Sequence, residues 1–178
     1  MKAGYVKWIN PFNQNPSYVS FDNCRVIVFW TKNPRPLIPL LPEMDKRGIN
    51  YYFQYTLNNY DKELEPGVPS LDSRIETFIE LAKIVGKDRI IWRFDPLMIT
   101  KEMNVDELIS RLESVGSKIH SFTSKLVISF ADISAYQKVQ NNLNRTGVYS
   151  TDLSDSNMLL VAEKISVLAK KWGLSVAT

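Results

Sequence analysis

The chain has 178 residues, of which 44% are hydrophobic and 23% are charged, so its composition is that of a globular protein rather than a disordered one. This length suits one domain with a buried apolar core, and we expect residues 1–178 to form a single domain. The 22 basic and 19 acidic residues leave a net charge of +3, which is too small to indicate nucleic-acid binding.

The cysteine and histidine content excludes several kinds of site. Cys24 is the only cysteine and His120 the only histidine, so the chain cannot form an internal disulfide. Zinc and iron–sulfur sites usually need about four such ligands, so we expect no Cys/His metal cluster and assign no metal ligand; a Mg²⁺ site formed by Asp95 and Asp132 stays open as a generic alternative. A reducing compartment is then the default, and the sequence contains neither a signal segment nor a run approaching ~18 apolar residues. We therefore expect a cytoplasmic protein that does not enter a membrane.

The first half of the chain contains four strand-like segments and one short helix. Residues 4–9 and 17–21 flank a turn rich in Asn and Pro, which predicts an N-terminal hairpin. Residues 25–30 and 51–58 are largely apolar and end in polar residues, as buried parallel strands do. Between them, four prolines and an apolar stripe over residues 37–44 predict a short helix that begins at proline.

The second half alternates helices with strands. Apolar spacing predicts a helix that ends at Gly86, and Asn104 is expected to cap another. Residues 89–96 form an apolar strand closed by Pro96, which cannot donate a ladder hydrogen bond. The other expected elements are a strand at 125–132, a helix from Tyr136 through Val139 to near Gly147, a helix over 158–172 and a last strand at 174–178.

Strands that alternate with helices of about four turns indicate right-handed βαβ units and a parallel sheet. Because the strands are unbroken apolar runs, we expect both faces of the sheet to be covered. A complete (β/α)₈ barrel needs about 250 residues, so this chain provides about five or six units, in a partial barrel or an open sheet. The expected fold class is α/β, with parallel βα units forming a partial TIM-like (β/α) barrel. We expect Trp30 and Trp92 to fill its interior, with a wall of a ligand pocket as the alternative for either.

Both architectures place function at the carboxyl ends of the strands. Lys32 and Arg93 lie there and suit a carboxylate or a phosphate, so we expect a positively biased cup for a small anionic ligand. A structural role is the alternative for each residue, since Arg93 and Asp95 could simply pair. The polar residues expected on this rim are Thr31, Lys32, Asn33, Gln54, Thr56, Asn58, Arg93, Asp95, Ser129 and Asp132.

Four short motifs occur in order along the chain. They are Phe-Trp-Thr-Lys-Asn-Pro at 29–34, Tyr-Tyr-Phe-Gln-Tyr-Thr at 51–56, Ile-Trp-Arg-Phe-Asp-Pro at 91–96 and Val-Ile-Ser-Phe at 127–130. Together they resemble the successive motifs of a bacterial family of uncharacterised proteins that is linked to radical S-adenosylmethionine enzymes through a C-terminal cysteine cluster. The Thr-Lys-Asn-Pro and Arg-Phe-Asp-Pro pieces also resemble strand ends of spore-photoproduct-lyase-type radical enzymes.

The resemblance implies S-adenosylmethionine as the cofactor. Relatives in that family begin with an additional strand and continue into a cysteine-rich tail that holds a [4Fe–4S] cluster. Cys24 alone cannot hold such a cluster, and without one nothing supplies the electron that cleaves S-adenosylmethionine. We therefore expect a fragment or a shortened relative in which the cofactor-binding rim persists. The cofactor-binding candidates are Thr31, Lys32, Asn33, Gln54, Thr56, Arg93 and Ser129, and the catalytic candidates are Asp95 and Lys32.

Three functions are compatible with this pattern, and whether the chain is an enzyme stays open. The first is the barrel portion of a radical-S-adenosylmethionine-like enzyme that binds a small ligand at the strand ends. The second is a cluster-independent hydrolase or lyase, with Asp95 or Asp132 as general base and Lys32 or Arg93 stabilising an oxyanion.

The third function is a non-catalytic binding or assembly module. An incomplete barrel leaves strand edges exposed near residues 4–9 and 174–178, and such edges favour homo-oligomers. Cys24 precedes a strand, so we expect a small buried side chain there rather than a nucleophile.

Overall fold

The computed structural model describes residues 4–178, except for the side chains of residues 138 and 139, so the expected helix position Val139 lies outside the described side chains. Strands alternate with helices, which confirms an α/β fold. The strands are β1 (Tyr5–Ile9), β2 (Pro16–Ser20), β3 (Ile27–Thr31), β4 (Tyr51–Thr56), β5 (Ile90–Leu97), β6 (Ile99–Thr100), β7 (Lys125–Phe130), β8 (Ser150–Thr151) and β9 (Ser175–Ala177). The helices are α1 (Leu41–Lys46), α2 (Leu71–Val85), α3 (Val105–Ile119), α4 (Gln137–Thr146) and α5 (Asp155–Trp172), with 3₁₀ helices η1 (Arg35–Leu40), η2 (Lys87–Arg89) and η3 (His120–Phe122).

Five strands form one open, parallel sheet in the order β3-β4-β5-β7-β9. Within this sheet each strand lies beside the one that precedes it in the chain, so the sheet is wound in one direction, as in a barrel, and does not reverse as doubly wound sheets do. In the described residues the sheet does not close, and β3 and β9 are its edges. The parallel α/β architecture is confirmed, and the TIM-like barrel stays a prediction.

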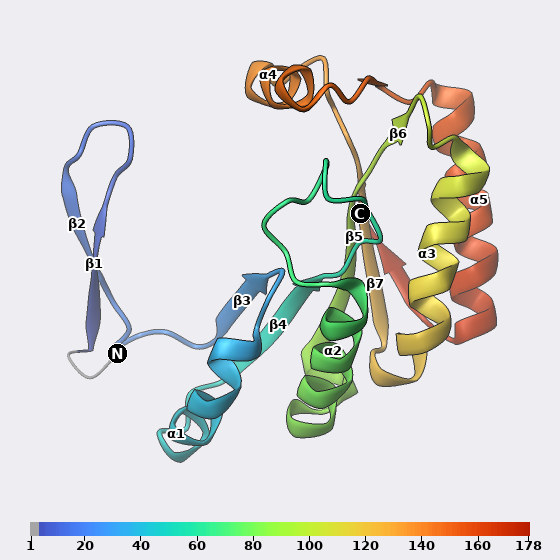
Figure 1. Cartoon of the computed structure of the whole chain (residues 1–178). Helices are drawn as coiled ribbons and strands as arrows, with labels where there is room; N and C mark the ends of the chain where they lie inside the picture. The colour runs from blue at the N-terminus through green and yellow to red at the C-terminus, as the bar shows by residue number, and fades with distance from the viewer. Residues whose placement is uncertain (1–3) are drawn as a thin grey trace.

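Helices α2, α3 and α5 cover one face of this sheet (Figure 1). Right-handed crossovers that all advance in the same direction place their helices on the same side. The strand residues that face these helices, such as Phe53 and Trp92, are fully buried. Their neighbours Gln54 and Arg93 point to the opposite face and are only half-buried. The expectation that both faces are covered is therefore wrong for the part of the chain that the structure describes.

Aromatic side chains fill much of the core between the sheet and the helices. The buried ring of Tyr55 stacks on Phe78 with 5.4 Å between the centroids, and the indole N–H of Trp92 donates to the carbonyl of Leu57 at 3.0 Å. Trp92 thus faces the helices, whereas Trp30 lies on the uncovered face and is 67% exposed. The expectation that both tryptophans fill a barrel interior is wrong, because the strand register places them on opposite faces of the sheet.

The long helices end where the sequence predicts, and α3 begins at the predicted cap, whereas α5 begins at Asp155, three residues before the predicted start. At the start of α3 the side chain of Asn104 accepts a hydrogen bond from the backbone N–H of Glu107 at 3.0 Å. Gly86 directly follows α2, and Gly173 follows α5 in the left-handed conformation, with φ of 68°. Within residues 4–178, no helix combines the length and the apolar character that crossing a membrane requires.

Three local features differ from the sequence prediction. The proline segment forms η1 before the six-residue α1, because Pro39 has no N–H for an α-helical hydrogen bond. Strand β5 does not stop at Pro96 but continues to Leu97. Its pairing with β7 shifts register between Phe94 and Leu97, so the missing N–H of Pro96 falls where the ladder is already interrupted. Strands β6 and β8 form a small antiparallel sheet that the sequence analysis did not predict.

Strands β1 and β2 form the predicted N-terminal hairpin, with Tyr5 opposite Ser20 and Ile9 opposite Pro16. The hairpin is a sheet of its own, and among the described residues no strand pairing joins it to the five-stranded sheet. Figure 1 shows it standing well apart from the helical layer. Cys24 lies in the segment that links the hairpin to β3 and is exposed, so the expectation of a buried cysteine is wrong.

Candidate functional site

The carboxyl ends of four neighbouring strands bring polar side chains to one edge of the sheet. The register places Trp30 of β3 beside Gln54 of β4, and Thr56 of β4 beside Arg93 of β5. Residues paired in this way point to the same face of a sheet. Asp95 follows Arg93 by two residues and therefore points to the same face, the one that the helices leave uncovered.

Arg93 lies at the centre of this cluster and is held from several sides. Its Nε donates to Asp95 at 3.0 Å, its Nη2 also donates to Asp95, and its Nη1 donates to Gln54 at 2.7 Å. The guanidinium carbon lies 4.3 Å from the ring centroid of Trp30, which is a cation–π contact. The indole N–H of Trp30 donates in turn to the hydroxyl of Thr56 at 3.2 Å. The plane of the guanidinium is thereby fixed by the protein itself.

Asp95 is fixed through both its side chain and its backbone. The hydroxyl of Ser129 donates to one carboxylate oxygen, and Arg93 occupies the other. The side chain of Asn58 forms two hydrogen bonds with the Asp95 backbone: its Nδ2 donates to the carbonyl at 3.0 Å and its Oδ1 accepts from the N–H at 2.9 Å. Asn58 is fully buried, so these two hydrogen bonds hold the end of β5 against the segment that follows β4.

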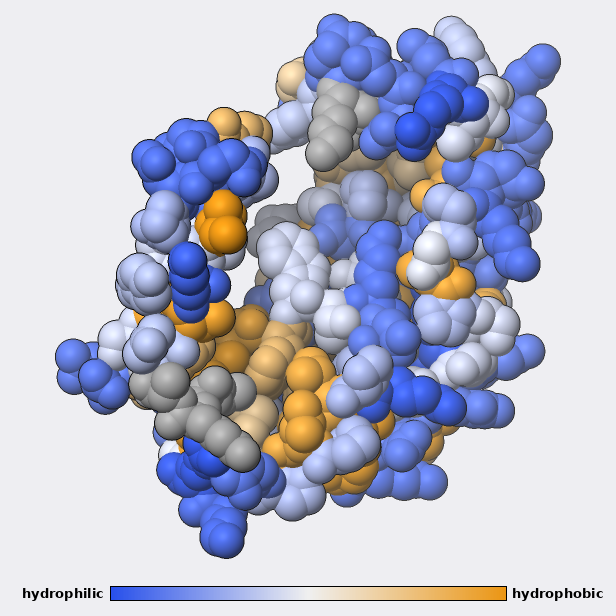
Figure 2. Space-filling model, turned by 60° about the vertical axis from the view of Figure 1, so that its left-hand side comes forward, coloured by the Kyte–Doolittle hydropathy of each residue, from blue (hydrophilic) through white to orange (hydrophobic). Residues whose placement is uncertain are grey.

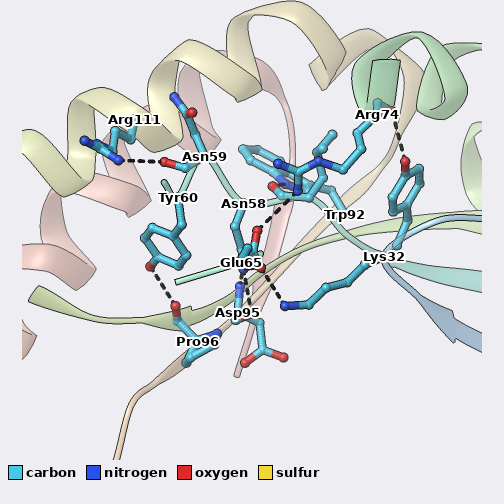
Figure 3. Close-up of polar contacts among 12 residues, drawn as sticks. Lys32, Asn58, Asn59, Tyr60, Glu65, Arg74, Trp92, Asp95, Pro96 and Arg111 are labelled. Atoms are coloured by element: carbon cyan, nitrogen blue, oxygen red, sulfur yellow. Dashed lines mark hydrogen bonds and ion pairs between the residues drawn. The ribbon is translucent and has the colours of Figure 1, made fainter. Parts of the chain in front are cut away.

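Glu65 connects Asn58 to two cations, Lys32 and Arg74 (Figure 3). Its carboxylate accepts hydrogen bonds from Lys32 at 2.5 Å, from Asn58 at 3.0 Å and from Arg74 at 3.3 Å. The side chains of Glu65 and Arg74 are 4% and 3% exposed, whereas that of Lys32 is 45% exposed. Glu65 is therefore a buried charge that one buried and one half-exposed cation neutralise.

The two cations predicted for the rim both have acidic partners. Lys32 pairs with Glu65, and Arg93 pairs with Asp95. The positively biased cup that the sequence suggested is therefore not a region of unopposed positive charge. Asp95 follows Arg93 on the same strand, and Glu65 lies in the loop after β4, so the fold itself supplies both counter-charges.

Three other predicted residues shape the loops around the cluster. The backbone N–H of Asn33 donates to the hydroxyl of Thr31 at 3.0 Å, and the side chain of Asn33 accepts from the backbone of Arg35 at 3.3 Å. Asp132 accepts from the backbone N–H of Ala135 at 3.1 Å. Thr31, Asn33 and Asp132 thus each make a local turn contact of the kind that Ser, Thr, Asn and Asp commonly form.

A hollow of about 470 Å³ opens beside the cluster. This volume lies in the range of about 300–1,000 Å³ that is usual for small-ligand sites. The hollow brings four predicted rim residues together. Gln54 and Thr56 stand outside its lining but contact Arg93 and Trp30, which form part of it, whereas Lys32 stands outside the lining and contacts Glu65. Its lining includes Trp30, Arg93, Asp95, Ser129, Asp132 and Tyr136.

Sequence reasoning missed the buried part of this site. Glu65 and Arg74 were not among the candidates, because neither a loop glutamate nor a helical arginine carries a local sign of burial. Tyr60 was missed as well, although its hydroxyl donates to the carbonyl of Pro96 at 2.7 Å and burial raises its pKa. Asn58 was placed on the rim but not among the site residues, and its position directly after an apolar strand is the signal that could have found it.

The resemblance implies two bound groups, a [4Fe–4S] cluster and S-adenosylmethionine. The residues of this chain do not suit both of them equally. A [4Fe–4S] cluster needs about four cysteines, and the chain has only Cys24, which is exposed and donates to the carbonyl of Val26 at 3.3 Å. In the described part of the chain, no three His, Cys, Asp or Glu side chains gather into a group that could hold a metal ion. The hollow at Arg93 has the volume and the donors for an organic ligand with a carboxylate.

Consecutive βα units, a parallel sheet wound in one direction and polar side chains at the carboxyl ends of its strands define the class of this protein as a parallel α/β protein. Residues 1–178, the whole chain, match the model of a family described as a domain of unknown function (DUF1848), and the chain belongs to this family. No curated protein and no solved structure matches the chain significantly.

Proposed function

We propose that this protein is the barrel portion of a radical-S-adenosylmethionine-like enzyme and binds the anionic carboxylate group of a small ligand in the hollow beside Arg93. The observation that carries the proposal is the convergence of side chains from three strands of one sheet, Trp30 of β3, Arg93 of β5 and Ser129 of β7, on one hollow. Active sites of parallel α/β proteins lie at this end of the strands.

Arg93 supplies the affinity for an anion. A guanidinium has five N–H groups, and the contacts to Asp95 and Gln54 use three of them. One N–H on each terminal nitrogen has no partner among residues 4–178, and two such groups match the two oxygens of a carboxylate. Because Asp95 already balances the charge, a ligand that also carries a cationic group fits better than a multiply charged anion.

S-adenosylmethionine is the ligand that the resemblance suggests. It also meets the charge requirement above, because it combines a carboxylate with positively charged groups. It supplies radical chemistry only with a reduced [4Fe–4S] cluster, whose cysteine ligands this chain's residues do not provide. The role proposed for these residues is therefore to bind and orient. Arg93 holds the carboxylate, and Trp30 forms a wall of the hollow.

The catalytic candidates take more limited roles in this proposal. Asp95 positions Arg93 and Ser129, and both of its oxygens already accept hydrogen bonds. Lys32 stands outside the lining of the hollow and stays in contact with Glu65, although nearly half of its side chain is exposed. Gln54 and Thr56 orient Arg93 and Trp30 through the contacts described above.

A cluster-independent hydrolase or lyase is the second candidate, and one observation favours it. The hydroxyl of Ser129 donates to Asp95, which places a nucleophile in contact with a carboxylate base. Arg93 occupies the other oxygen of that carboxylate. Because this pairing ties up the base, we rank the hydrolase below ligand binding.

Isothermal titration of the folded chain with S-adenosylmethionine tests the proposal. Arg93→Gln keeps hydrogen-bonding groups but removes the cationic fork, and we expect it to weaken binding at least tenfold. Arg47→Gln is the matched control, because Arg47 pairs with Glu43 on the surface of α1, away from the hollow. Circular dichroism establishes that each variant is folded. Equal affinity of the Arg93 variant and the wild type, or absence of binding to the wild type, would refute the proposal.

A further inference from the structure

The N-terminal hairpin exposes apolar side chains on both of its faces. Tyr5, Ile9 and Tyr18 lie on one face and Val6, Trp8 and Val19 on the other, and each is between 45% and 64% exposed. Phe12 at the tip is 96% exposed. Figure 2 shows open space between the hairpin and the body of the molecule. An isolated two-stranded hairpin is only marginally stable in water, so we expect another surface to cover the apolar side chains of this hairpin.

The exposed area is large enough for an interface. The exposed parts of the four aromatic side chains amount to on the order of 500 Å², taking about 200 Å² for each whole side chain, and the aliphatic side chains add to this. The largest apolar patch of a typical monomer is about 300–600 Å², and a standard interface buries about 800 Å² per partner. Residues 5–20 include one charged residue, Lys7, and depletion of charge is typical of an interface core.

A second apolar surface of the same chain matches the apolar character of this hairpin. The uncovered face of the five-stranded sheet presents Val28, Tyr52 and Ile91 on neighbouring strands, and Val28 is exposed. A hollow of about 370 Å³ near the amino ends of these strands is lined by Val26, Tyr52 and Ile91 among others. Parallel sheets are normally covered on both faces, so this apolar face lacks its usual cover in the described structure.

We propose that the protein forms a twofold dimer in which the hairpin of each copy covers the amino-terminal half of the uncovered sheet face of the other copy. The partner is a second copy because the hairpin and the uncovered sheet face belong to the same chain and are both apolar. A twofold dimer therefore contains two equivalent contacts, each between the hairpin of one copy and the sheet face of the other. The proposal goes beyond ligand binding and does not rest on it, since Arg93 and the hollow beside it lie at the opposite end of the strands.

Sedimentation equilibrium over a concentration series tests the dimer. The wild type is expected to reach twice the chain mass of 20.5 kDa. Trp8→Ser changes the hairpin and Val28→Ser changes the sheet face, and each is expected to raise the dissociation constant at least tenfold. Val167→Ser on α5 is the control, because Val167 is an apolar side chain that is 69% exposed outside both surfaces.

Mixing the two variants distinguishes this arrangement from other dimers. A dimer of one Trp8→Ser copy and one Val28→Ser copy retains one unaltered hairpin on one unaltered face, so the mixture is expected to associate more tightly than either variant alone. Hairpins that only packed against each other would give no such gain and would overturn the proposal. A monomer at every concentration, or a dimer that the two substitutions leave unchanged, would overturn it as well.

Discussion

Replacing Glu65 with glutamine removes the negative charge that the fold buries beneath the candidate site. Glutamine keeps nearly the same size and retains an oxygen for Lys32 or Asn58, so packing changes little. The cost arises at Arg74, whose side chain is 3% exposed and which loses the negative charge of its partner Glu65. Removing one partner of a buried ion pair costs about 3–5 kcal/mol, because the other charge stays buried without compensation.

The exposure of Lys32 decides how the cost of Lys32→Gln compares with the cost of Glu65→Gln. Lys32 is half-exposed, so water solvates its ammonium group and its pairing with Glu65 contributes at most about 1 kcal/mol. We therefore expect Lys32→Gln to lower the free energy of unfolding by about 1 kcal/mol or less and Glu65→Gln by about 3 kcal/mol or more. Glu43→Gln, which breaks an exposed pair with Arg47 one helical turn away, should cost about 0.5 kcal/mol or less.

Urea unfolding followed by circular dichroism measures these differences. For a chain of this length, about 3 kcal/mol corresponds to a fall in Tm of roughly 6–12 °C, which thermal scans should reproduce. The reasoning fails if Glu65→Gln costs less than about 1 kcal/mol, or if Lys32→Gln costs as much as Glu65→Gln. Either result would mean that Glu65 does not act as a buried counter-charge for Arg74.

Two further predictions concern packing and pH. A Cβ atom added at Gly116 would lie 2.2 Å from the ring of Trp172, so Gly116→Ala should destabilise by about 1–3 kcal/mol in urea unfolding, whereas Gly67→Ala, with no atom within 4 Å, should cost about 0.5 kcal/mol or less. Burial raises the pKa of Tyr55 and of Tyr60 above the ordinary value of 10.0. Above about pH 10 only the unfolded chain releases these protons, so each tyrosine lowers the free energy of unfolding by about 1.4 kcal/mol per pH unit. Tyr60→Phe should make this decline shallower by that amount, and an unchanged slope would contradict the assignment.

Ligand binding and dimerisation are separable in experiment. The Arg93→Gln variant leaves the hairpin intact, and the Trp8→Ser variant leaves the hollow intact, so each variant serves as a control for the other measurement. A dimer that forms without ligand binding would support the assembly surface alone. Ligand binding by a monomer would support the site alone.

Local patterns in the sequence were sufficient to place most elements. The apolar runs that predicted β3, β4, β5 and β7 depend on residues next to one another in the chain, and so do the cap at Asn104 and the hairpin turn. The parallel arrangement also followed from sequence, because strands alternating with helices leave few other topologies. Short pairings such as β6 with β8 were missed, since two residues carry too little pattern.

The candidate site was only partly predictable. Arg93, Asp95 and Ser129 were expected at the strand ends, and their common hollow follows from the parallel register of the strands. Glu65 and Arg74 could not be found in this way, because charged residues in loops and helices are usually solvated. Only the tertiary structure buries both of them and uses Asn58 to connect them to the end of β5.

The sequence by itself determined which segments are strands or helices and which polar residues end the strands, because these properties depend on neighbours in the chain. The tertiary structure decided which face the helices cover, which side chains pair and where apolar surface stays exposed. Trp30 and Trp92 illustrate the difference, since both directly precede the first polar residue of an apolar run but lie on opposite faces of the sheet. Such choices depend on register and on contacts between residues far apart in the chain, which no local pattern contains.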